Sequence, residues 1–273
     1  CYWGYYKFLV SFYMKNAVLI TGGAKRLGSL IAQQLSKENY FIIIHYNNSE
    51  SEAILTKEKI LKNGGDVALI KKNIKSAFDA SELILEALNF VKKISVNQFT
   101  LINNASAFIY DNAENFEESV LDDHMHANFK IPVLLTKNLH KHLNSSLLGN
   151  VINMLDAKLF GLNSDHYTYT LSKYALLGLT EVAALSYAPN LRVNGIAPGF
   201  TLSNPKQQLS DFKRIQELNP LSRGPQADDL INAIKFLINT LSVTGENIII
   251  DGGAHLSPQK RDAAFLWKEE LWT

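Results

Sequence analysis

The alternation of short apolar runs with segments of helical periodicity is the feature of this 273-residue chain that most restricts its fold. Runs such as 16–21 (NAVLIT) and 40–46 (YFIIIHY) are apolar almost throughout, as is typical of strands buried on both faces of a parallel sheet. Helical segments separate these runs, and no Gly/Ser-rich linker interrupts the pattern. The sequence therefore predicts one α/β domain, a doubly wound seven-stranded parallel sheet with helices on both faces.

The expected elements follow from the two periodicities. We expect strands at 16–21, 40–46, 67–70, 99–103, 150–155, 191–196 and 247–250, and helices at 27–37, 51–62, 78–92, 119–142, 167–187 and 227–239. Residues 201–223 are expected to form an irregular polar stretch.

The folded domain is predicted to span 14–256. Residues 1–13 are apolar but lack a basic segment and a cleavage site, so we interpret them as an extension rather than a signal peptide. They are too few to span a membrane. In the tail, 257–273, Phe265, Leu266 and Trp267 could pack on a neighbouring subunit or on their own domain.

Charge and cysteine content restrict the partners. A net charge of +1 gives no electrostatic reason to expect nucleic acid or an anionic membrane. The only cysteine is Cys1, so neither an intrachain disulfide nor a cysteine-based metal site can form, and no metal is expected. This composition favours a reducing compartment, and we expect a cytoplasmic protein.

A glycine-containing turn, 21–28 (TGGAKRLG), joins the first predicted strand to the first helix. Glycines let the backbone approach a pyrophosphate, and free N–H groups at the helix start can bind it. The strand–turn–helix context favours a dinucleotide site over an ordinary turn and makes the domain Rossmann-type. The residues assigned to the cofactor here are Thr21, Gly22, Lys25, Arg26, Leu27 and Gly28.

The second predicted strand ends without the carboxylate that would select the free ribose 2′-hydroxyl of NAD. The residues there are His45, Tyr46, Asn47, Asn48 and Ser49. Because Lys25 and Arg26 lie nearby in the glycine turn, the sequence favours NADP. The polar run could instead be a loop cap.

Polar residues also follow the later strands, at the edge where ligands bind in such sheets. Asn104 and Ala105 end the fourth strand, Asp156 follows the fifth, and the pair Pro198 and Gly199 follows the sixth. Each of these could be an ordinary turn or cap. Asp156 could instead hydrogen-bond to a catalytic group or to substrate.

Tyr169 and Lys173 share a helix face, because they stand at positions i and i+4. An ammonium group beside a phenol stabilises the phenolate, so we expect the tyrosine pKa to be lowered. Such a tyrosine can exchange protons near neutral pH.

Together these motifs resemble the short-chain dehydrogenase/reductase family: the glycine turn, Asn-Asn-Ala at 103–105, Asn128 in the middle helix, Tyr169 with Lys173, and the Pro-Gly pair. The resemblance covers about residues 16–256. It is closest to the pteridine reductases and the dihydromonapterin reductases. Four features point to that branch: Arg26 in the turn, Ser106-Ala107-Phe108 after Asn-Asn-Ala, Asp156 in place of the usual catalytic serine, and His45-Tyr46 followed by a polar run.

The resemblance implies roles for individual residues. Tyr169, assisted by Lys173 and Asp156, would protonate a ring nitrogen while hydride passes from NADPH to the adjacent carbon of a C=N bond. Asn128 would hold a water that links Lys173 to solvent. The residues assigned to substrate are Arg26, Ser106, Phe108, Asp156 and Tyr169, and those further assigned to cofactor are Asn73, Asn104, Ala105, Ser106, Tyr169, Lys173, Pro198 and Gly199. At Asn48 and Asn73 the chain departs from the family pattern. The departure at Asn48 weakens the assignment of NADP as the cofactor.

The resemblance therefore predicts an NADPH-dependent reductase of a pterin, dihydropterin or dihydrofolate-like ring, acting as a homotetramer or homodimer. A reductase of 3-oxoacyl or other carbonyl substrates is the first alternative, although it would be expected to carry Ser at position 156. A non-catalytic NADP-binding scaffold is the second, and the retention of Asn128, Tyr169 and Lys173 argues against it.

Overall fold

Seven parallel strands form one sheet in the order β3-β2-β1-β4-β5-β6-β7. The computed structural model describes residues 15–94, 96–144, 146–202, 209–262 and 265–266. The predicted extension and Trp267 lie outside these ranges. The strands are β1 (Lys15–Ile20), β2 (Tyr40–Tyr46), β3 (Asp66–Lys71), β4 (Val96–Asn103), β5 (Leu148–Met154), β6 (Leu191–Pro198) and β7 (Asn247–Ile250). The predicted doubly wound fold is confirmed.

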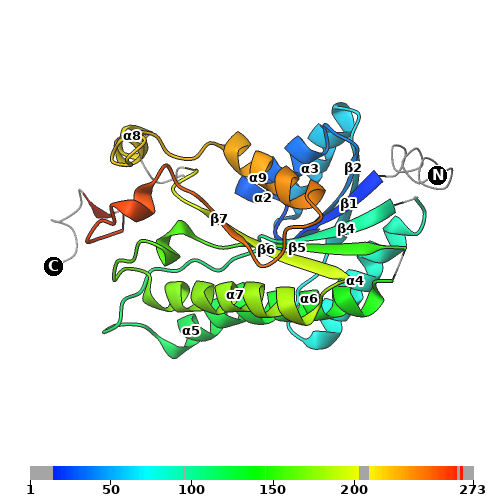
Figure 1. Cartoon of the computed structure of the whole chain (residues 1–273), viewed down its shortest axis with the longest axis horizontal. Coiled ribbons are helices and arrows are strands. Elements are labelled where there is room, and N and C mark those ends of the chain that lie inside the picture. Colours follow the sequence, from blue (N-terminus) through cyan, green and yellow to red (C-terminus); the bar gives the residue numbers. More distant parts are fainter. Residues whose placement is uncertain (1–14, 95, 145, 203–208, 263–264, 267–273) are drawn as a thin grey trace.

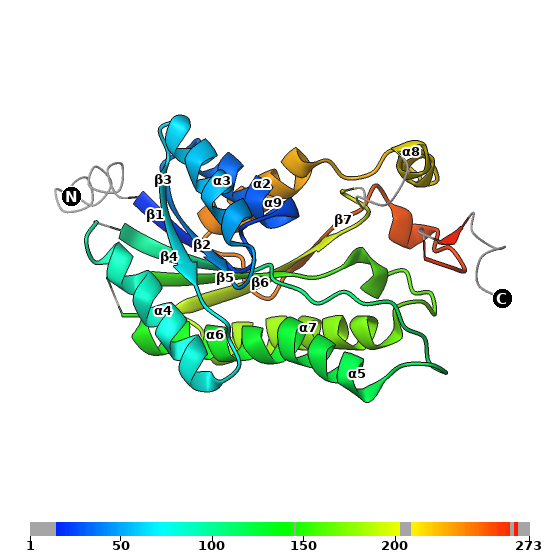
Figure 2. The same ribbon diagram turned by 180° about the vertical axis from the view of Figure 1, so that it is seen from behind.

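Helices cover both faces of the sheet, as Figures 1 and 2 show. One face carries α2 (Arg26–Leu35), α3 (Glu50–Lys62) and α9 (Ala227–Asn239), and the other carries α4 (Ala77–Val91), α5 (Glu118–Met125), α6 (Ile131–His142) and α7 (Tyr167–Ser186). Along β2, Ile42 and Ile44 pack into one hydrophobic core and Ile43 into the other. Two covered faces explain why these strands are continuously apolar.

Two predicted elements differ from the structure. The single helix expected at 119–142 is divided, because a π-helical segment, η1 (His126–Lys130), separates α5 from α6. Residues 201–223 were predicted to be irregular, but α8 (Leu209–Glu217) lies within them. That helix buries Ile215 and is otherwise largely polar, so its composition resembled a loop.

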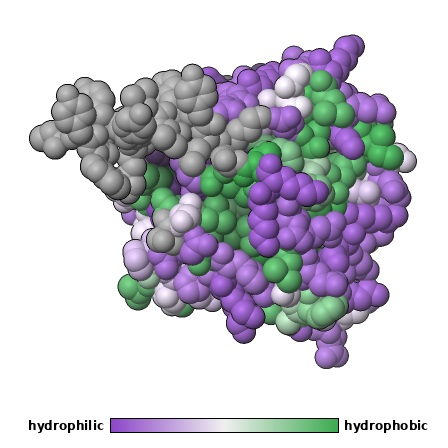
Figure 3. Space-filling view, turned by 90° about the vertical axis from the view of Figure 1, so that its right-hand side faces the viewer, coloured by the Kyte–Doolittle hydropathy of each residue, from purple (hydrophilic) through white to green (hydrophobic). Residues whose placement is uncertain are grey.

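The strand order reverses between β1 and β4, which are neighbours at the centre of the sheet. Ligands of doubly wound folds bind beyond the carboxyl ends of the strands at such a reversal. In Figure 1 this end faces α8 and the C-terminal segment. The opposite end is a mixture of hydrophilic and hydrophobic residues (Figure 3). None of the helices described here is long and apolar enough to cross a membrane.

Candidate functional site

An open groove of about 1540 Å³ runs across the carboxyl ends of the central strands. It brings together most residues that the sequence assigned to cofactor and substrate. Those lining it are Gly22, Lys25, Arg26, Leu27, Gly28, His45, Tyr46, Asn47, Asn48, Ser49, Asn104, Ala105, Ser106, Phe108, Asp156, Tyr169, Lys173, Pro198 and Gly199.

Three predicted residues are not part of the groove lining. Asn73 is exposed beyond the end of β3, and the groove does not reach it. Thr21 is buried beneath the groove, where its hydroxyl accepts the N–H groups of Asn104 and Ala105. Thr21 therefore holds the backbone of Asn104 and Ala105 in place from beneath the groove. Asn128 also lies behind the lining.

The glycine turn forms a cradle that side chains would fill. Gly22 has φ +60°, and a Cβ on it would lie 3.1 Å from Ala105 Cα. A Cβ on Gly28 would lie 2.5 Å from the Gly22 carbonyl oxygen. Helix α2 starts at Arg26 without a side-chain cap, so its first N–H groups remain available for an anion. This is the geometry that a dinucleotide pyrophosphate requires.

Asn104 fixes the glycine turn to the neighbouring strand end. Its amide Nδ2 donates to the carbonyl oxygens of Thr21 (2.9 Å) and Gly22 (3.2 Å). The Gly23 N–H donates to the His45 carbonyl at 3.1 Å, which joins the turn to β2. The turn is therefore held from both sides in the shape of the cradle.

The end of the groove beside β2 carries cations from the glycine turn rather than a carboxylate. Among the described lining residues there, Lys25 and Arg26 are the charged ones, and 47–49 contribute amides and a hydroxyl. His45 is buried, and burial lowers its pKa to about 4, so its ring is neutral near pH 7. An additional phosphate here would therefore depend on Lys25, Arg26 and neutral donors.

The catalytic candidates meet at the middle of the groove. The Tyr169 hydroxyl donates to the Asp156 carboxylate at 2.8 Å, and both side chains lie next to the open groove. Lys173 Nζ donates to the Met154 carbonyl at 2.7 Å and lies 5.6 Å from the centre of the Tyr169 ring. Asp156 also accepts the Lys158 N–H and so caps the short helix η2 (Ala157–Leu159). It is both a cap and a partner of the tyrosine.

The expectation of a lowered tyrosine pKa is wrong for this arrangement. Burial raises the Tyr169 pKa well above its usual value, and the adjacent Asp156 carboxylate raises it further. Burial also raises the Asp156 pKa, and burial lowers the Lys173 pKa to about 8. Lys173 Nζ lies 5.6 Å from the centre of the ring, and burial and the carboxylate decide the direction of the shift. Tyr169 is therefore a protonated phenol near neutral pH, and its hydroxyl donates a hydrogen bond to the Asp156 carboxylate.

Asn128 lies in the π-helical segment η1, a type of helix defect often found at functional sites. Its amide oxygen accepts the Ser106 hydroxyl and the Ala107 N–H, and its Nδ2 donates to the Ala107 carbonyl and to Ser172 Oγ. The side-chain amide therefore makes four hydrogen bonds, two through its oxygen and two through its nitrogen. The side chain therefore fixes the segment that precedes Phe108, and the water predicted beside Asn128 stays a prediction.

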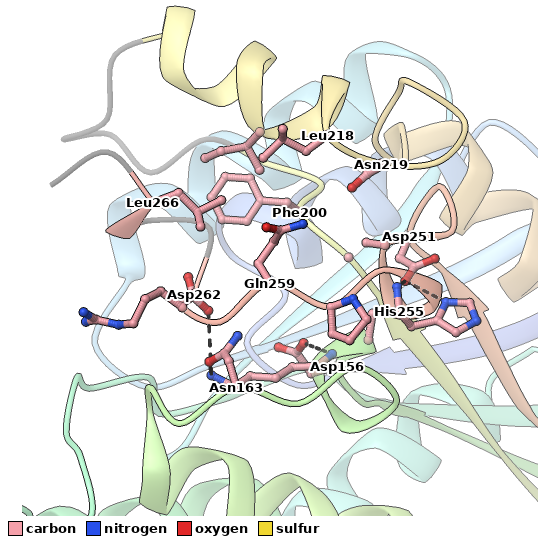
Figure 4. A pocket seen from close by; sticks show the side chains of 18 of the residues that line it. Asp156, Asn163, Phe200, Leu218, Asn219, Asp251, His255, Gln259, Asp262 and Leu266 are labelled. Atoms are coloured by element: carbon pink, nitrogen blue, oxygen red, sulfur yellow. Dashed lines mark hydrogen bonds and ion pairs between the residues drawn. The ribbon is translucent and has the colours of Figure 1, made fainter. Parts of the chain in front are cut away.

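A smaller pocket of about 210 Å³ opens beside the catalytic pair (Figure 4). Asp156 lies on one side, and Phe200, Leu218 and Leu266 contribute apolar surface opposite it. Tyr169 also lines the pocket. Polar and charged groups also line it, among them Lys158, Asn163, Asn219, Asp251, His255, Gln259, Arg261 and Asp262.

Aromatic rings form the wall next to the catalytic tyrosine. Phe108 stacks on His166 with ring centres 4.3 Å apart, and it meets Tyr169 edge-to-face at 4.7 Å. The sequence identified Phe108 as a stacking residue but not His166. His166 adopts a left-handed conformation (φ 53°) directly before α7, which no local sequence pattern indicates.

A buried hydrogen-bond network behind this wall was also not predicted. Asp111 accepts the N–H (3.1 Å) and the hydroxyl of Thr168, and so caps α7 from a distant loop. His124 accepts the Ile109 N–H at 3.1 Å, and its Nδ1 lies 2.8 Å from Thr168 Oγ1. Burial lowers the His124 pKa, which favours the neutral ring that can accept this bond. The network ties the loop of Phe108 to the start of the catalytic helix.

Comparisons with known proteins agree with this geometry. The model of the short chain dehydrogenase family matches residues 16–214. The chain therefore belongs to the short-chain dehydrogenase family, a family of oxidoreductases. A 3-oxoacyl-(acyl-carrier-protein) reductase of Staphylococcus epidermidis is 27% identical, over 89% of this chain and 100% of that protein. An uncharacterized oxidoreductase of Thermotoga maritima is 30% identical, over 88% of this chain and 97% of that protein.

Among solved structures, the chain is similar to the FolM alternative dihydrofolate reductase 1 of Brucella canis in complex with NADP. The TM-score is 0.81 at 33% identity, and the match covers 90% of this chain and 96% of that one. The corresponding protein of Brucella suis, also in complex with NADP, has a TM-score of 0.78 at 32% identity, over 88% of this chain and 95% of that one.

We expect Tyr169→Phe to lower turnover by about 10²–10⁴-fold, because the phenol is the proton donor beside the open pocket. NADPH affinity should change little, since the phenyl ring remains. Stopped-flow and steady-state rates would measure the first quantity, and fluorescence titration the second. Tyr187→Phe, at the far end of the same helix, is the matched control. Unchanged turnover in Tyr169→Phe would remove this residue from the chemistry.

Proposed function

We propose that this protein is an NADPH-dependent reductase of a pterin, dihydropterin or dihydrofolate-like ring. The observation that carries the proposal is the hydrogen bond from Tyr169 to Asp156 at the mouth of the pocket. Burial raises the pKa of the Asp156 carboxyl, and its hydrogen bond to Tyr169 would let the pair relay a proton to a ring nitrogen, a role that a serine hydroxyl would not fill. The similarity to Brucella proteins titled alternative dihydrofolate reductases supports the same substrate class.

The cofactor fits the residues present. The cradle at Gly22 and Gly28 and the uncapped start of α2 would hold the pyrophosphate, and Lys25 with Arg26 would hold a 2′-phosphate. When bound, the nicotinamide supplies the hydride. Lys173 is positioned at the strand end beside Tyr169, where a ribose hydroxyl would be within its reach.

The chain's own residues perform three tasks. Phe108 and the adjacent rings offer a flat apolar surface for stacking. Tyr169 and Asp156 present protons at the edge of that surface. The tail, α8 and η2 restrict water around the pair, which strengthens electrostatic interactions inside the pocket.

Reduction of a 3-oxoacyl thioester is the competing function, because the Staphylococcus relatives carry that activity in their names. Rates of NADPH oxidation with dihydropterin, dihydrofolate and an acetoacetyl thioester separate the two. Reduction of the thioester alone would overturn the proposal, and a chain that binds NADPH without reducing any of the three would be a scaffold.

We expect NADPH to bind at least about tenfold more tightly than NADH, since one charge-assisted hydrogen bond contributes about 1.5–3 kcal/mol. Arg26→Gln should weaken NADPH binding while leaving NADH binding nearly unchanged. Fluorescence titration of the four combinations measures both effects. Equal affinities of the parent for the two cofactors would show that this end of the groove does not select the phosphate.

We expect Asp156→Ser to reduce the rate on dihydropterin by about 10²-fold, with little change in NADPH affinity. Asp156→Asn keeps the shape but cannot supply the proton, so it should lose a similar amount. A Ser variant as fast as the parent would leave Asp156 as a cap only. A gain of thioester reduction in the Ser variant would show that position 156 sets the substrate class.

We also propose that the protein self-associates through the outer face of α7. Apolar side chains recur along this face and are exposed, Leu171 by 44%, Val182 by 65% and Leu185 by 84%, which is unusual for a monomer. Gly178 leaves open space on the helix, so a second helix could approach closely.

Light scattering should therefore give a mass that is a multiple of the 30.6 kDa chain. Leu185→Glu should shift the protein toward the monomer, because it places a charge in the apolar contact. Leu241→Glu, at an exposed leucine outside α7, is the control and should leave the mass unchanged. A monomeric parent would contradict this proposal.

A further inference from the structure

The C-terminal segment forms one wall of the pocket above the catalytic pair. Beyond η3 (Ala254–Leu256), the chain turns back toward Asp156, as Figure 4 shows for Gln259, Asp262 and Leu266. The residues that this segment contributes to the pocket lining are Ser257, Pro258, Gln259, Arg261, Asp262 and Leu266. The segment lies outside residues 16–214, which match the family model.

Asp165 is the main anchor of this segment. Its side chain is buried (3% exposed), and its carboxylate accepts Arg261 Nε at 2.9 Å and the Asp262 N–H at 2.7 Å. Burial alone would raise the Asp165 pKa. The hydrogen bonds from Arg261 and the Asp262 N–H oppose it, and the net shift of the pKa is downward. A buried carboxylate without charged partners is unfavourable. Asp165 therefore stabilises the position of the segment that supplies Arg261 and the Asp262 N–H.

Lys158 ties the same residues to the loop that carries Asp156. Its side chain is 8% exposed, and its Nζ donates to Asn163 Oδ1 and to the Asp165 carbonyl. Nζ also lies 3.8 Å from the Asp262 carboxylate. The loop that carries Asp156 therefore also carries Asp165, which holds the segment. The buried Lys158 stands between these two residues in the sequence.

Aromatic contacts close the segment over the wall described above. The Phe265 ring meets Tyr110 at 4.9 Å and lies 6.0 Å from the His166 ring. Arg261 lies over Phe265 at 5.4 Å, so one side chain joins the ion pair to the aromatic cluster.

We propose that Asp165 and Arg261 anchor the C-terminal segment as a specificity element, which limits the pocket to small, flat substrates. The proposal does not depend on whether a ring or a carbonyl is reduced, because it concerns the wall and not the proton donors. Loosening the anchor should weaken small-substrate binding and favour bulkier substrates.

Arg261→Met tests the anchor first without substrate. Because Arg261 is a surface residue, 44% exposed on its side chain, its replacement should leave the fold intact. Hydrogen exchange of the peptide containing the Asp262 amide should accelerate by about tenfold or more, because Asp165, the acceptor of that amide, would lose the guanidinium that holds its carboxylate. Lys235→Met removes a surface ion pair between α9 and Glu38 in the turn after α2, and it is the matched control. Unchanged exchange in Arg261→Met would overturn the anchor.

The second measurement is kinetic and uses whichever of the three test substrates the parent reduces. We expect kcat/KM for the smallest reduced substrate to fall by about tenfold, mainly through KM, with NADPH affinity unchanged. The preference for dihydrofolate over dihydropterin should rise. Faster exchange with unchanged kinetics would make the segment structural only. A parent that reduces only the thioester would refute the proposed pterin activity, whereas the exchange and KM measurements would still decide the role of the anchor.

Discussion

The hydrogen bond between Tyr169 and Asp156 is the interaction on which the arrangement of the site depends. It joins two neighbouring parts of the chain, the catalytic helix α7 and the loop after β5, at the edge of the pocket. Burial raises the pKa of both groups, and the Asp156 carboxylate raises that of Tyr169 further. Lys173, held by the Met154 carbonyl, supplies positive charge nearby without contacting the phenol oxygen. The structure therefore places a protonated phenol, not a phenolate, at this position.

The start of α7 is fixed by groups outside the helix, and this explains the unusual backbone there. His166 precedes the helix in a left-handed conformation and provides no side-chain cap, so Asp111 caps Thr168 instead. The same loop carries Phe108, which stacks on His166. The same contacts therefore position both the catalytic tyrosine and the aromatic wall. The neutral His124 completes it by accepting a backbone N–H of that loop.

Sequence reasoning could predict what is periodic or local. The sheet, the glycine turn and the Tyr169–Lys173 pair each follow from spacing, and the structure brings them to one groove. The polar α8 and the π-helical segment were missed because the first resembles a loop and the second interrupts an otherwise regular pattern. The direction of the tyrosine pKa was wrong because spacing cannot report a burial energy or a carboxylate from another element. Asp165 and Arg261 meet across almost a hundred residues, so no local signal connects them.

Similarity to both acyl-carrier-protein reductases and FolM proteins is no contradiction in physical terms. The family model matches residues 16–214, which hold the cofactor groove and the catalytic helix that such reductases need alike. The identity is 27% to one of the acyl-carrier-protein reductases and 33% to one of the FolM proteins, each averaged over about nine tenths of the chain. The pocket depends on far fewer residues: Asp156, the loop that carries Phe108, and the segment anchored at Asp165. Since substrates are distinguished by the few groups that they contact, these positions carry more weight on substrate class than the overall identity does.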